Sequence, residues 1–392
     1  MPQRRTSAAM GLMTSMVLVG LAAPPAIWAQ AAQPAGTSRC RPTIIALPLP
    51  AGTTSGDVLS ATATIAVGPV ADDAQHNSVA VWRKKSGTWT VQDLGDFGIS
   101  APFEPLSATG VNAGGEVTIG VNADVMGGWL YSNGVIHRLK DFAGGPNAYV
   151  RAINRTGEMV GEALDAKGND FAAKWMHWWS RPIRLAPTHG YDGSFAQGLN
   201  DAGFVVGGSF SNGSNATLPV RWSPDGAVTV LAHPTDGAEG FDINGAGRVV
   251  GVGYTPTGTS ALTWNPAGHV RNLGMFAGDT FARAIGVDAR GDVVGFSGAN
   301  PPPPAVPVRH VLYSPGAGAA RSLLPLSLSW ADGAYSHALD DQGDVFGASA
   351  MTHVAIPQPT EWTCAAAQSF VPPTGAASAS ARPTVNPRVI HN

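Results

Sequence analysis

The residues best suited to recognising a ligand are two tryptophans in the segment Trp175-Met176-His177-Trp178-Trp179. Trp175 ends an apolar stretch and is expected in the core, whereas Trp178 and Trp179 lie beyond it, where the next strand should begin. An exposed indole ring offers a flat apolar face with a polar edge, on which a sugar can stack. Packing between neighbouring structural units is the simpler explanation of the same pair. We take Trp178 and Trp179 as the candidate ligand-binding residues.

The sequence contains no local motif for catalysis or metal binding. No Gly-x-Ser-x-Gly nucleophile elbow occurs, and the ten histidines show neither His-x-His nor His-Glu-x-x-His spacing. No Asp-x-Asp-x-Asp-Gly calcium loop occurs, and the acidic residues beside glycines are explained first by turn formation. We therefore expect no catalytic residue, no metal and no cofactor. A fold that gathers distant residues around one centre would be the exception.

The first 31 residues have the features of a secretory signal. Arg4 and Arg5 precede an apolar stretch that ends near Ala23, and Ala29-Gln30-Ala31 provides a small-x-small cleavage site. The stretch is short for a membrane span, so an uncleaved anchor is the less favoured alternative. Removal of residues 1–31 leaves 22 basic and 27 acidic residues, and this negative balance argues against a nucleic-acid partner. We expect a secreted monomer, extracellular or periplasmic, with no membrane span in the mature chain.

One pattern recurs six times: an apolar residue, Asn or Asp, two variable residues, Gly, and shortly afterwards a hydrophobic pair and Gly. The copies are Val111–Gly120 (one residue longer than the others), Ile153–Gly161, Leu199–Gly207, Ile243–Gly251, Val287–Gly295 and Leu339–Gly347. The closing glycines lie 41, 46, 44, 44 and 52 residues apart. Asn or Asp followed by Gly three residues later fits a type I turn, in which the Gly takes a positive φ and begins a return strand. Each copy therefore predicts a β-hairpin.

A large aromatic residue ends a short apolar stretch once in every unit. These anchors are Trp82, Tyr131, Trp175, Trp222, Trp264, Tyr313 and Trp362. After most of them a further strand ends in Leu, which makes four short strands per unit. Four-stranded units of this length are typical of propeller blades. A parallel β-helix would use shorter coils, and a β-sandwich does not repeat one motif six times. We predict an all-β, seven-bladed β-propeller of four-stranded repeats.

The two ends of the repeat region complement each other. The last unit lacks a closing Leu strand, whereas Pro42–Leu49 is a lone strand-like segment before the first unit. We predict that this N-terminal strand pairs with the last blade and closes the ring, because closure removes open strand edges. The only cysteines, Cys40 and Cys364, flank these segments and are predicted to form a disulfide, with two free thiols as the alternative. The expected organisation is a signal peptide over 1–31, a propeller over 40–366 and a disordered tail over 367–392.

The units resemble the HAF repeat, a bacterial extracellular repeat family. Its pattern joins a Gly-Ile-Asn-x-x-Gly-x-Val-Val-Gly hairpin to a His-Ala-Phe-Leu-Trp strand and an Asp-Leu-Gly strand. The matching stretches here are Gly198–Gly207 and Asn272-Leu273-Gly274, and the resemblance covers nearly the whole mature chain. The name-giving tripeptide is absent, since the equivalent positions read Leu218-Pro219-Val220 and Arg309-His310-Val311. The resemblance implies an exported, propeller-like repeat protein and implies no reaction.

Three functions remain open on the sequence. The first is a non-enzymatic binding or scaffold module for a protein or a glycan. The second is a propeller enzyme acting on polysaccharide, a lyase or a hydrolase. It requires two carboxylates, or a His–carboxylate pair, close together at the mouth of the central channel. The third is a purely structural repeat without a specific ligand.

Overall fold

Strands form all of the regular structure in the described part of the chain. The computed structural model describes residues 43–98 except 75, 106–121, 127–213, 217–299 except 235, 309–314, 321–323, 333–351 and 354–363. The predicted signal peptide, the predicted tail and both cysteines lie outside these ranges. Within them, no helix has the length and apolar character needed to cross a bilayer.

The strands follow one another as antiparallel meanders, and we call each meander a blade. The first contains β2 (Ser55–Gly56), β3 (Ser60–Ala61), β4 (Ile65–Ala71), β5 (Asn77–Lys85) and β6 (Thr88–Asp93). The next two contain β7 (Leu106–Val111), β8 (Val117–Val121), β9 (Gly127–Ser132) and β10 (Val135–Arg138), then β11 (Ala148–Ile153), β12 (Met159–Leu164), β13 (Asp170–Trp175) and β14 (Ile183–Leu185).

The remaining blades continue the series. They contain β15 (Gly193–Leu199), β16 (Val205–Phe210), β17 (Thr217–Trp222) and β18 (Val228–Val230), then β19 (Ala238–Ile243), β20 (Val249–Thr255), β21 (Gly258–Trp264) and β22 (Val270–Asn272). After them come β23 (Phe281–Val287), β24 (Val293–Gly298), β25 (Arg309–Tyr313) and β26 (Arg321–Ser322). The last group contains β27 (Gly333–Leu339), β28 (Val345–Met351) and β29 (Val354–Thr363), together with β1 (Thr43–Ala46).

Hydrogen bonding joins the described strands into six sheets. The largest has eight strands and consists of two successive meanders, β19–β22 and β23–β26, linked by a single parallel pairing of Thr259 with Phe281. If each meander is counted as one blade, the strands make the seven units that the repeat predicts. Because the hydrogen-bonded sheets number six, the seven-blade count stays a prediction.

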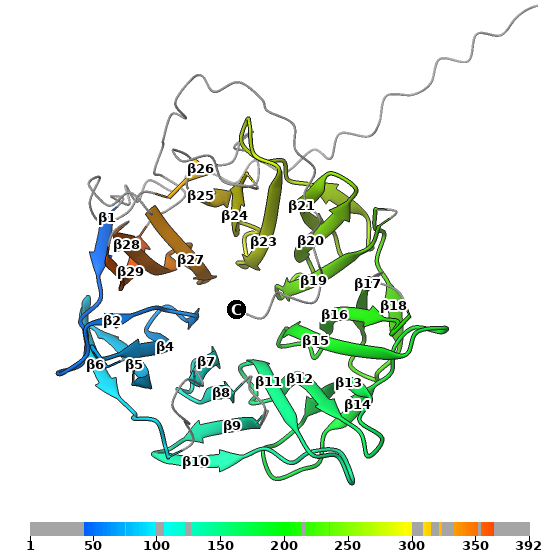
Figure 1. Ribbon diagram of the computed structural model, residues 1–392, viewed down its shortest axis with the longest axis horizontal. Coiled ribbons are helices and arrows are strands. Elements are labelled where there is room, and N and C mark those ends of the chain that lie inside the picture. The colour runs from blue at the N-terminus through cyan, green and yellow to red at the C-terminus, as the bar shows by residue number, and fades with distance from the viewer. Residues whose placement is uncertain are drawn as a thin grey trace, which may run out of the picture. The chain divides into compact units, whose positions relative to one another are not determined.

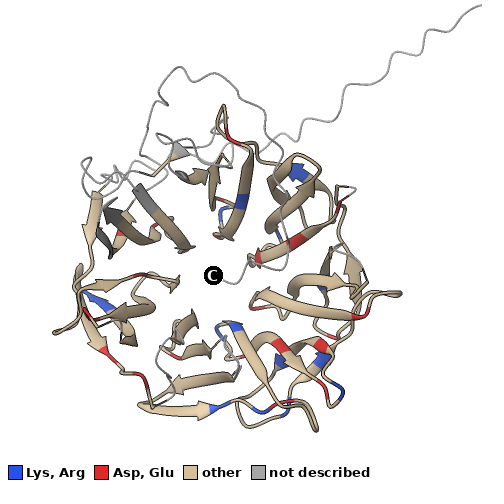
Figure 2. Cartoon of the chain, in the orientation of Figure 1, with Lys and Arg blue, Asp and Glu red and all other residues tan. Residues whose placement is uncertain are grey.

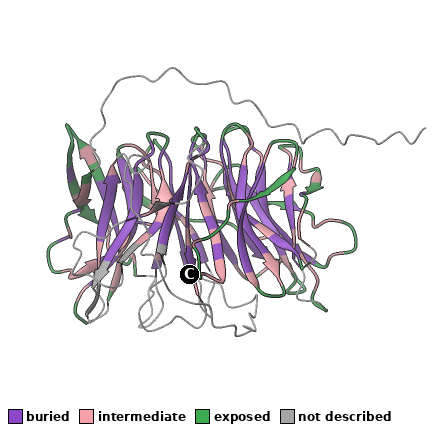
Figure 3. Cartoon of the chain, turned by 90° about the horizontal axis from the view of Figure 1, so that it is seen from above, coloured by how far each residue is buried: buried purple, intermediate pink, exposed green. Residues whose placement is uncertain are grey.

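The blades form a ring with one strand of each blade closest to its centre (Figure 1). The inner strands are β7, β11, β15, β19, β23 and β27, and the first blade contributes the segment that contains β2 and β3. Neighbouring inner strands contact one another around the ring, and β27 contacts β3. Seen from the side, the middle of the strands is buried between blades and the exposed residues lie mostly towards the two rims (Figure 3). The chain is therefore an all-β propeller, as predicted.

The N-terminal strand closes the ring, which confirms the sequence-based expectation. β1 pairs antiparallel with β29, placing Ile44 opposite Trp362. On the following blade, the Lys84 ammonium and the Trp89 indole N–H reach the buried Glu361 carboxylate of β29, at 2.6 and 2.7 Å. A charge-assisted network of this kind fixes the last blade against the first.

Within the described residues, five of the seven repeated aromatic anchors form a hydrogen bond to the preceding blade. The indole N–H of Trp222 donates to the carbonyl of Ala186 at 2.7 Å, directly after the Leu185 that ends the previous blade. The same bond runs from Trp82, Trp175 and Trp264 to Pro48, Lys140 and Ala232, and from the Tyr313 hydroxyl to Gly274. Pro48 follows β1, so the N-terminal segment takes the place of an outer strand of the last blade and provides the acceptor for Trp82. The anchors thus combine apolar burial with a satisfied polar edge.

The repeated asparagines form a second set of links between blades. The Asn200 carboxamide oxygen accepts the N–H groups of Ala202 and Phe204, and thereby closes its own turn. Its Nδ2 donates to the carbonyl of Asn244 in the next blade at 3.0 Å. The same bonds run from Asn112 to Asn154, from Asn154 to Asn200, and from Asn244 to Asp288. The last two copies have Asp in this place, and a carboxylate cannot make this donation.

The closing glycine of each hairpin is required by a close approach of backbone. A Cβ on Gly207 would overlap with the carbonyl oxygen of Phe195 on the inner strand, and Gly161 meets Tyr149 in the same way. In the copy with Gly120, the strand register places Ile119 at this position and Gly120 one residue later. The extra residue of that copy therefore does not lengthen its turn, and its glycine lies one residue beyond the closing position.

Candidate functional site

The predicted pair Trp178 and Trp179 lies in the turn between β13 and β14, on the outer half of its blade. Trp178 stacks on His137 of the preceding blade, with ring centroids 3.9 Å apart, and is half-buried. Trp179 stacks on His177 at 4.5 Å and is 54% exposed. The two indoles meet edge to face at 5.6 Å. We call His137, His177, Trp178 and Trp179 the aromatic cluster; Trp178 packs between blades, and Trp179 presents a ring to solvent.

A second group of residues is defined by the inner strands. One glycine per blade faces a backbone carbonyl on the inner strand and so marks the same position in six blades: Gly68, Gly161, Gly207, Gly251, Gly295 and Gly347. The residues at this inner position are Asp57, Tyr149, Phe195, Glu239, Arg283 and Tyr335. They include acidic, aromatic and basic residues, whereas the residue directly before each of them is small: Gly56, Ala148, Ser194, Ala238, Ala282 and Ala334. The fold therefore does not dictate the residue type at the inner position.

A His–carboxylate pair joins two of these inner strands. The Nε2 atom of His337 lies 2.9 Å from the Asp57 carboxylate, and the two side chains are 32% and 22% exposed. Burial lowers the pKa of His337, but the Asp57 carboxylate outweighs it, so the net pKa is raised. Such a pair is one of the two residue combinations that a propeller enzyme would require.

A neutral histidine lies behind this pair. His310 is buried, and its Nδ1 accepts the backbone N–H of Ser336 at 2.7 Å. Burial, reinforced by His337, lowers the pKa of His310 to about 3. Its ring lies 5.2 Å from that of Tyr335 and 6.4 Å from that of His337. His310 therefore stays uncharged. We call the rings of Phe296, His310 and Tyr335 the aromatic wall.

Charged side chains follow on the neighbouring inner strands: β19 carries acidic residues and β23 a basic one (Figure 2). Burial raises the pKa of the Glu239 carboxyl, which accepts the Tyr254 hydroxyl at 2.8 Å and is influenced by the positive charges of Arg283 and Arg151. Burial also lowers the pKa of Arg283, whose guanidinium lies 5.9 Å from the Phe296 ring. Phe296 in turn lies 5.6 Å from His310. We call Glu239, Arg283, His310, Tyr335, His337 and Asp57 the inner arc.

The β11–β14 blade adds a separate polar group beside the arc. Arg151 pairs with Glu162 at 2.7 Å, and its charge acts on Glu239 although the β15–β18 blade lies between them in the ring. Burial, with a further contribution from Glu162, raises the pKa of Asp170 to about 8. Asp170 thus keeps its proton at neutral pH.

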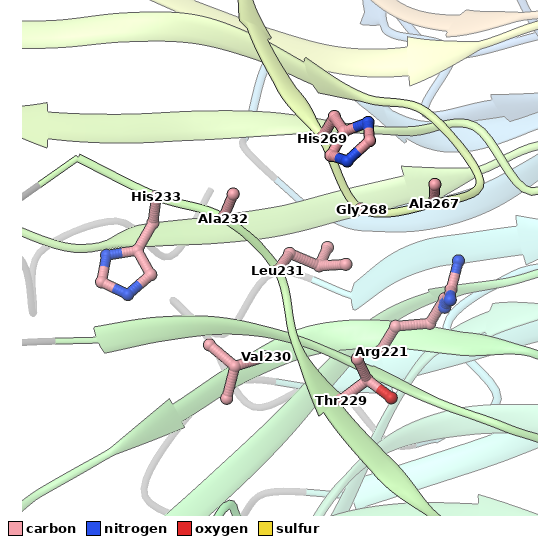
Figure 4. A pocket seen from close by; sticks show the side chains of 9 residues that line it. All are labelled: Arg221, Thr229, Val230, Leu231, Ala232, His233, Ala267, Gly268 and His269. Carbon is pink, nitrogen blue, oxygen red and sulfur yellow. The ribbon is translucent and has the colours of Figure 1, made fainter.

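A shallow hollow of about 570 Å³ lies away from the arc, between the β15–β18 and β19–β22 blades (Figure 4). Its lining includes Arg221, His233 and His269. The Arg221 guanidinium already donates to the carbonyl of Pro266 at 2.8 Å and lies over the Phe204 ring at 5.5 Å. Because Arg221 is already used in these contacts, the hollow is a weaker candidate for a ligand site than the arc.

The arc escaped local motif searches because its members come from distant blades. Their common signal is their spacing from the repeat: Glu239, Arg283 and Tyr335 each precede the hairpin Asn or Asp by five residues. Aligning the copies on that residue would have revealed the position. In the part of the chain that the structure describes, no group of three or more His, Cys, Asp or Glu residues is placed to hold a metal ion.

Solved structures with a similar fold share little sequence with this chain. Virginiamycin B lyase from Staphylococcus aureus is 11% identical with a TM-score of 0.50, over 83% of this chain and 99% of that one. A catalytically inactive variant of that lyase with quinupristin is 12% identical with a TM-score of 0.52, over 82% of this chain and 99% of that one. A prolyl endopeptidase gives 11% and 0.54 over 79% of this chain, which spans only 50% of the endopeptidase. These similarities show the propeller fold alone.

No protein-family model and no curated protein matches the sequence. The relation to the HAF repeat therefore stays a prediction. It depends on the hairpins and anchors described above.

Proposed function

We propose that the chain is an exported, non-enzymatic binding module whose ligand site is the inner arc. The observation that carries this proposal is the variation at the inner position, where one ring of equivalent sites holds Asp57, Glu239, Arg283 and Tyr335. Residues needed for folding repeat from blade to blade. Half-buried charges that do not repeat cost desolvation energy without serving the ring, and such a cost is typical of recognition sites.

The arc is favoured over the aromatic cluster because it joins several blades. A series of neighbouring side chains runs from Arg283 through Phe296 and His310 to His337 and Asp57, and the Arg283 charge also acts on Glu239. One ligand can therefore meet acidic, basic and aromatic groups together, which gives specificity as well as contact area. Trp178 and Trp179 remain our candidate for an accessory contact with a glycan on the outer half of the ring.

Export is part of the proposal and depends on the signal-like residues 1–31. We also retain the proposed Cys40–Cys364 disulfide. Thr43 and Thr363, a few residues away from these cysteines, lie directly opposite each other in the β1–β29 pair. This register supports a link between the two ends of the chain.

A second candidate is an enzyme acting on polysaccharide. It is favoured by His337 and Asp57, since a histidine oriented by a carboxylate is a competent general base. Catalysis also requires a partner acid within reach of the same substrate. The Tyr254 hydroxyl is engaged with Glu239, and burial and Glu239 raise its pKa far above neutral. Binding therefore accounts for more of the arc than catalysis does.

Arrays of glycans and proteins, probed with the full chain, test the proposal. We expect specific hits that are lost in Tyr335→Ala and kept in Arg271→Ala, a control on the exposed strand β22. Absence of hits on every array would contradict the proposal and favour a purely structural repeat. Turnover of any bound polysaccharide, abolished in His337→Ala, would replace it with the enzymatic alternative.

A further inference from the structure

Arg283 is the one member of the inner arc whose charge is not paired within the described residues. No hydrogen bond or ion pair connects its guanidinium to any of them; it lies 5.9 Å from the Phe296 ring, and Tyr254 and Glu239 act on it only through longer-range electrostatics. By contrast, Arg151 on β11 is held by Glu162. A half-buried guanidinium has five donors to satisfy, so an unpaired one is costly unless a ligand supplies acceptors.

The fold does not need a cation at this place. The equivalent inner position holds Phe195 in one blade and Tyr335 in another, and both blades keep the same hairpin and strand register. A structural role for the charge of Arg283 would require a partner, as Arg290 has with Asp288. Its charge is therefore available for an anionic group that comes from outside the chain.

The surroundings of Arg283 restrict what that ligand can be. On either side along the arc lie carboxyl groups, Glu239 and Asp57, which accept hydrogen bonds. Between Arg283 and Asp57 lie the rings of Phe296, His310 and Tyr335. The site thus offers one place for an anion, several acceptors for hydroxyl groups and an aromatic wall.

We propose that Arg283 binds the carboxylate of a glycan that contains uronic acid. This inference rests on the proposed binding function of the inner arc. A uronic acid carries one carboxylate, several hydroxyl donors and an apolar ring face, which match the guanidinium, the acidic residues and the aromatic wall. An acidic peptide presents a run of carboxylates, and Glu239 and Asp57 would repel those that Arg283 does not hold.

Binding of defined oligosaccharides by the full chain tests this assignment. The probes are neutral oligosaccharides that carry a single galacturonic acid or a single glucuronic acid, each compared with its carboxyl-reduced counterpart, and poly-glutamate serves as the acidic peptide. The variants are Arg283→Ala, Arg283→Lys and the control Arg271→Ala, on the exposed strand β22. Circular dichroism and thermal unfolding verify that each variant folds.

We expect an acidic oligomer to bind at least about tenfold more tightly than its reduced counterpart, as a charge-assisted pair predicts. Arg283→Ala should remove this preference, Arg283→Lys should keep only part of it, and Arg271→Ala should keep all of it. The result that overturns the inference but leaves the binding function intact is equal binding of acidic and reduced oligomers, or an undiminished preference in Arg283→Ala. Preference for poly-glutamate would overturn the glycan class. Absence of any ligand on the arrays would overturn the binding function as well.

Discussion

Replacing Asp340 by Asn should stabilise the protein at neutral pH. Asp340 occupies the place of the repeated asparagines, and its Oδ1 accepts the N–H groups of Gln342 and Asp344 at 2.9 Å. Its Oδ2 is buried and has no hydrogen-bond partner among the described residues. In the Asn copies, the corresponding Nδ2 donates to the next blade. Asp340→Asn restores a donor where the carboxylate leaves a buried oxygen unsatisfied.

The size and sign of the effect follow from the pKa of Asp340. Burial, followed by the nearby Asp344 charge and opposed by backbone N–H donors, raises this pKa from 3.8 to about 6. The folded state therefore holds the proton more tightly than the unfolded chain, and the free energy of unfolding falls as pH rises between these two values. At 1.36 kcal/mol per pKa unit, the fall amounts to about 3 kcal/mol and is complete above about pH 7.

Urea denaturation of the wild type and of Asp340→Asn between about pH 4 and pH 8 measures this contribution. The variant should gain stability over the wild type as pH rises, and the difference between the two should level off above about pH 7. Asp73→Asn, which removes the same charge from an exposed site, should follow the wild type. A difference between variant and wild type that does not change with pH, or a variant less stable than the wild type at pH 8, would refute the reasoning.

Three other substitutions test the ring and the arc. Trp222→Phe removes the indole donor to Ala186 and should lower the free energy of unfolding by about 1–3 kcal/mol in urea denaturation; no loss would argue against the links between blades. Gly207→Ala forces a Cβ against inner-strand backbone and should cost about 3 kcal/mol or more, or prevent folding, as judged by circular dichroism. The pKa of His337, followed by NMR, should lie above its ordinary value of 6.5 and drop below it in Asp57→Asn, where burial acts alone. An unchanged pKa in the variant would contradict the pairing of His337 with Asp57.

The architecture was largely predictable because its determinants are local and repeated. The hairpin Asn, the positive-φ glycine three residues later and the aromatic anchor each act within a few residues of their own strand. Gly203 and Gly247 have φ values of +82° and +79°, as the turn requires. The pairing of β1 with β29 was predictable too, because the last unit lacks its fourth strand and an extra strand precedes the first unit. The links from Asn side chains to the next blade were not, because nothing in one copy specifies its neighbour.

The inner arc was beyond prediction from single motifs for a physical reason. His337 and Asp57 are 280 residues apart, and only closure of the ring between last and first blades brings them to 2.9 Å. Their chemistry depends on burial and on partners, neither of which the local sequence encodes. Trp178 and Trp179, by contrast, are adjacent in sequence and form a pair that the sequence alone reveals. The structure places one of them between blades and the other in solvent.

NMR of the histidine side chains during ligand addition tests the central claim that the inner arc is the binding site. The tightest ligand found on the arrays is titrated into the full chain, and the resonances of His337 and His177 are followed together. We predict that the His337 signal shifts with saturation while that of His177, in the aromatic cluster, stays in place. A shift of His177 with His337 unchanged would contradict the account and move the binding site to Trp178 and Trp179.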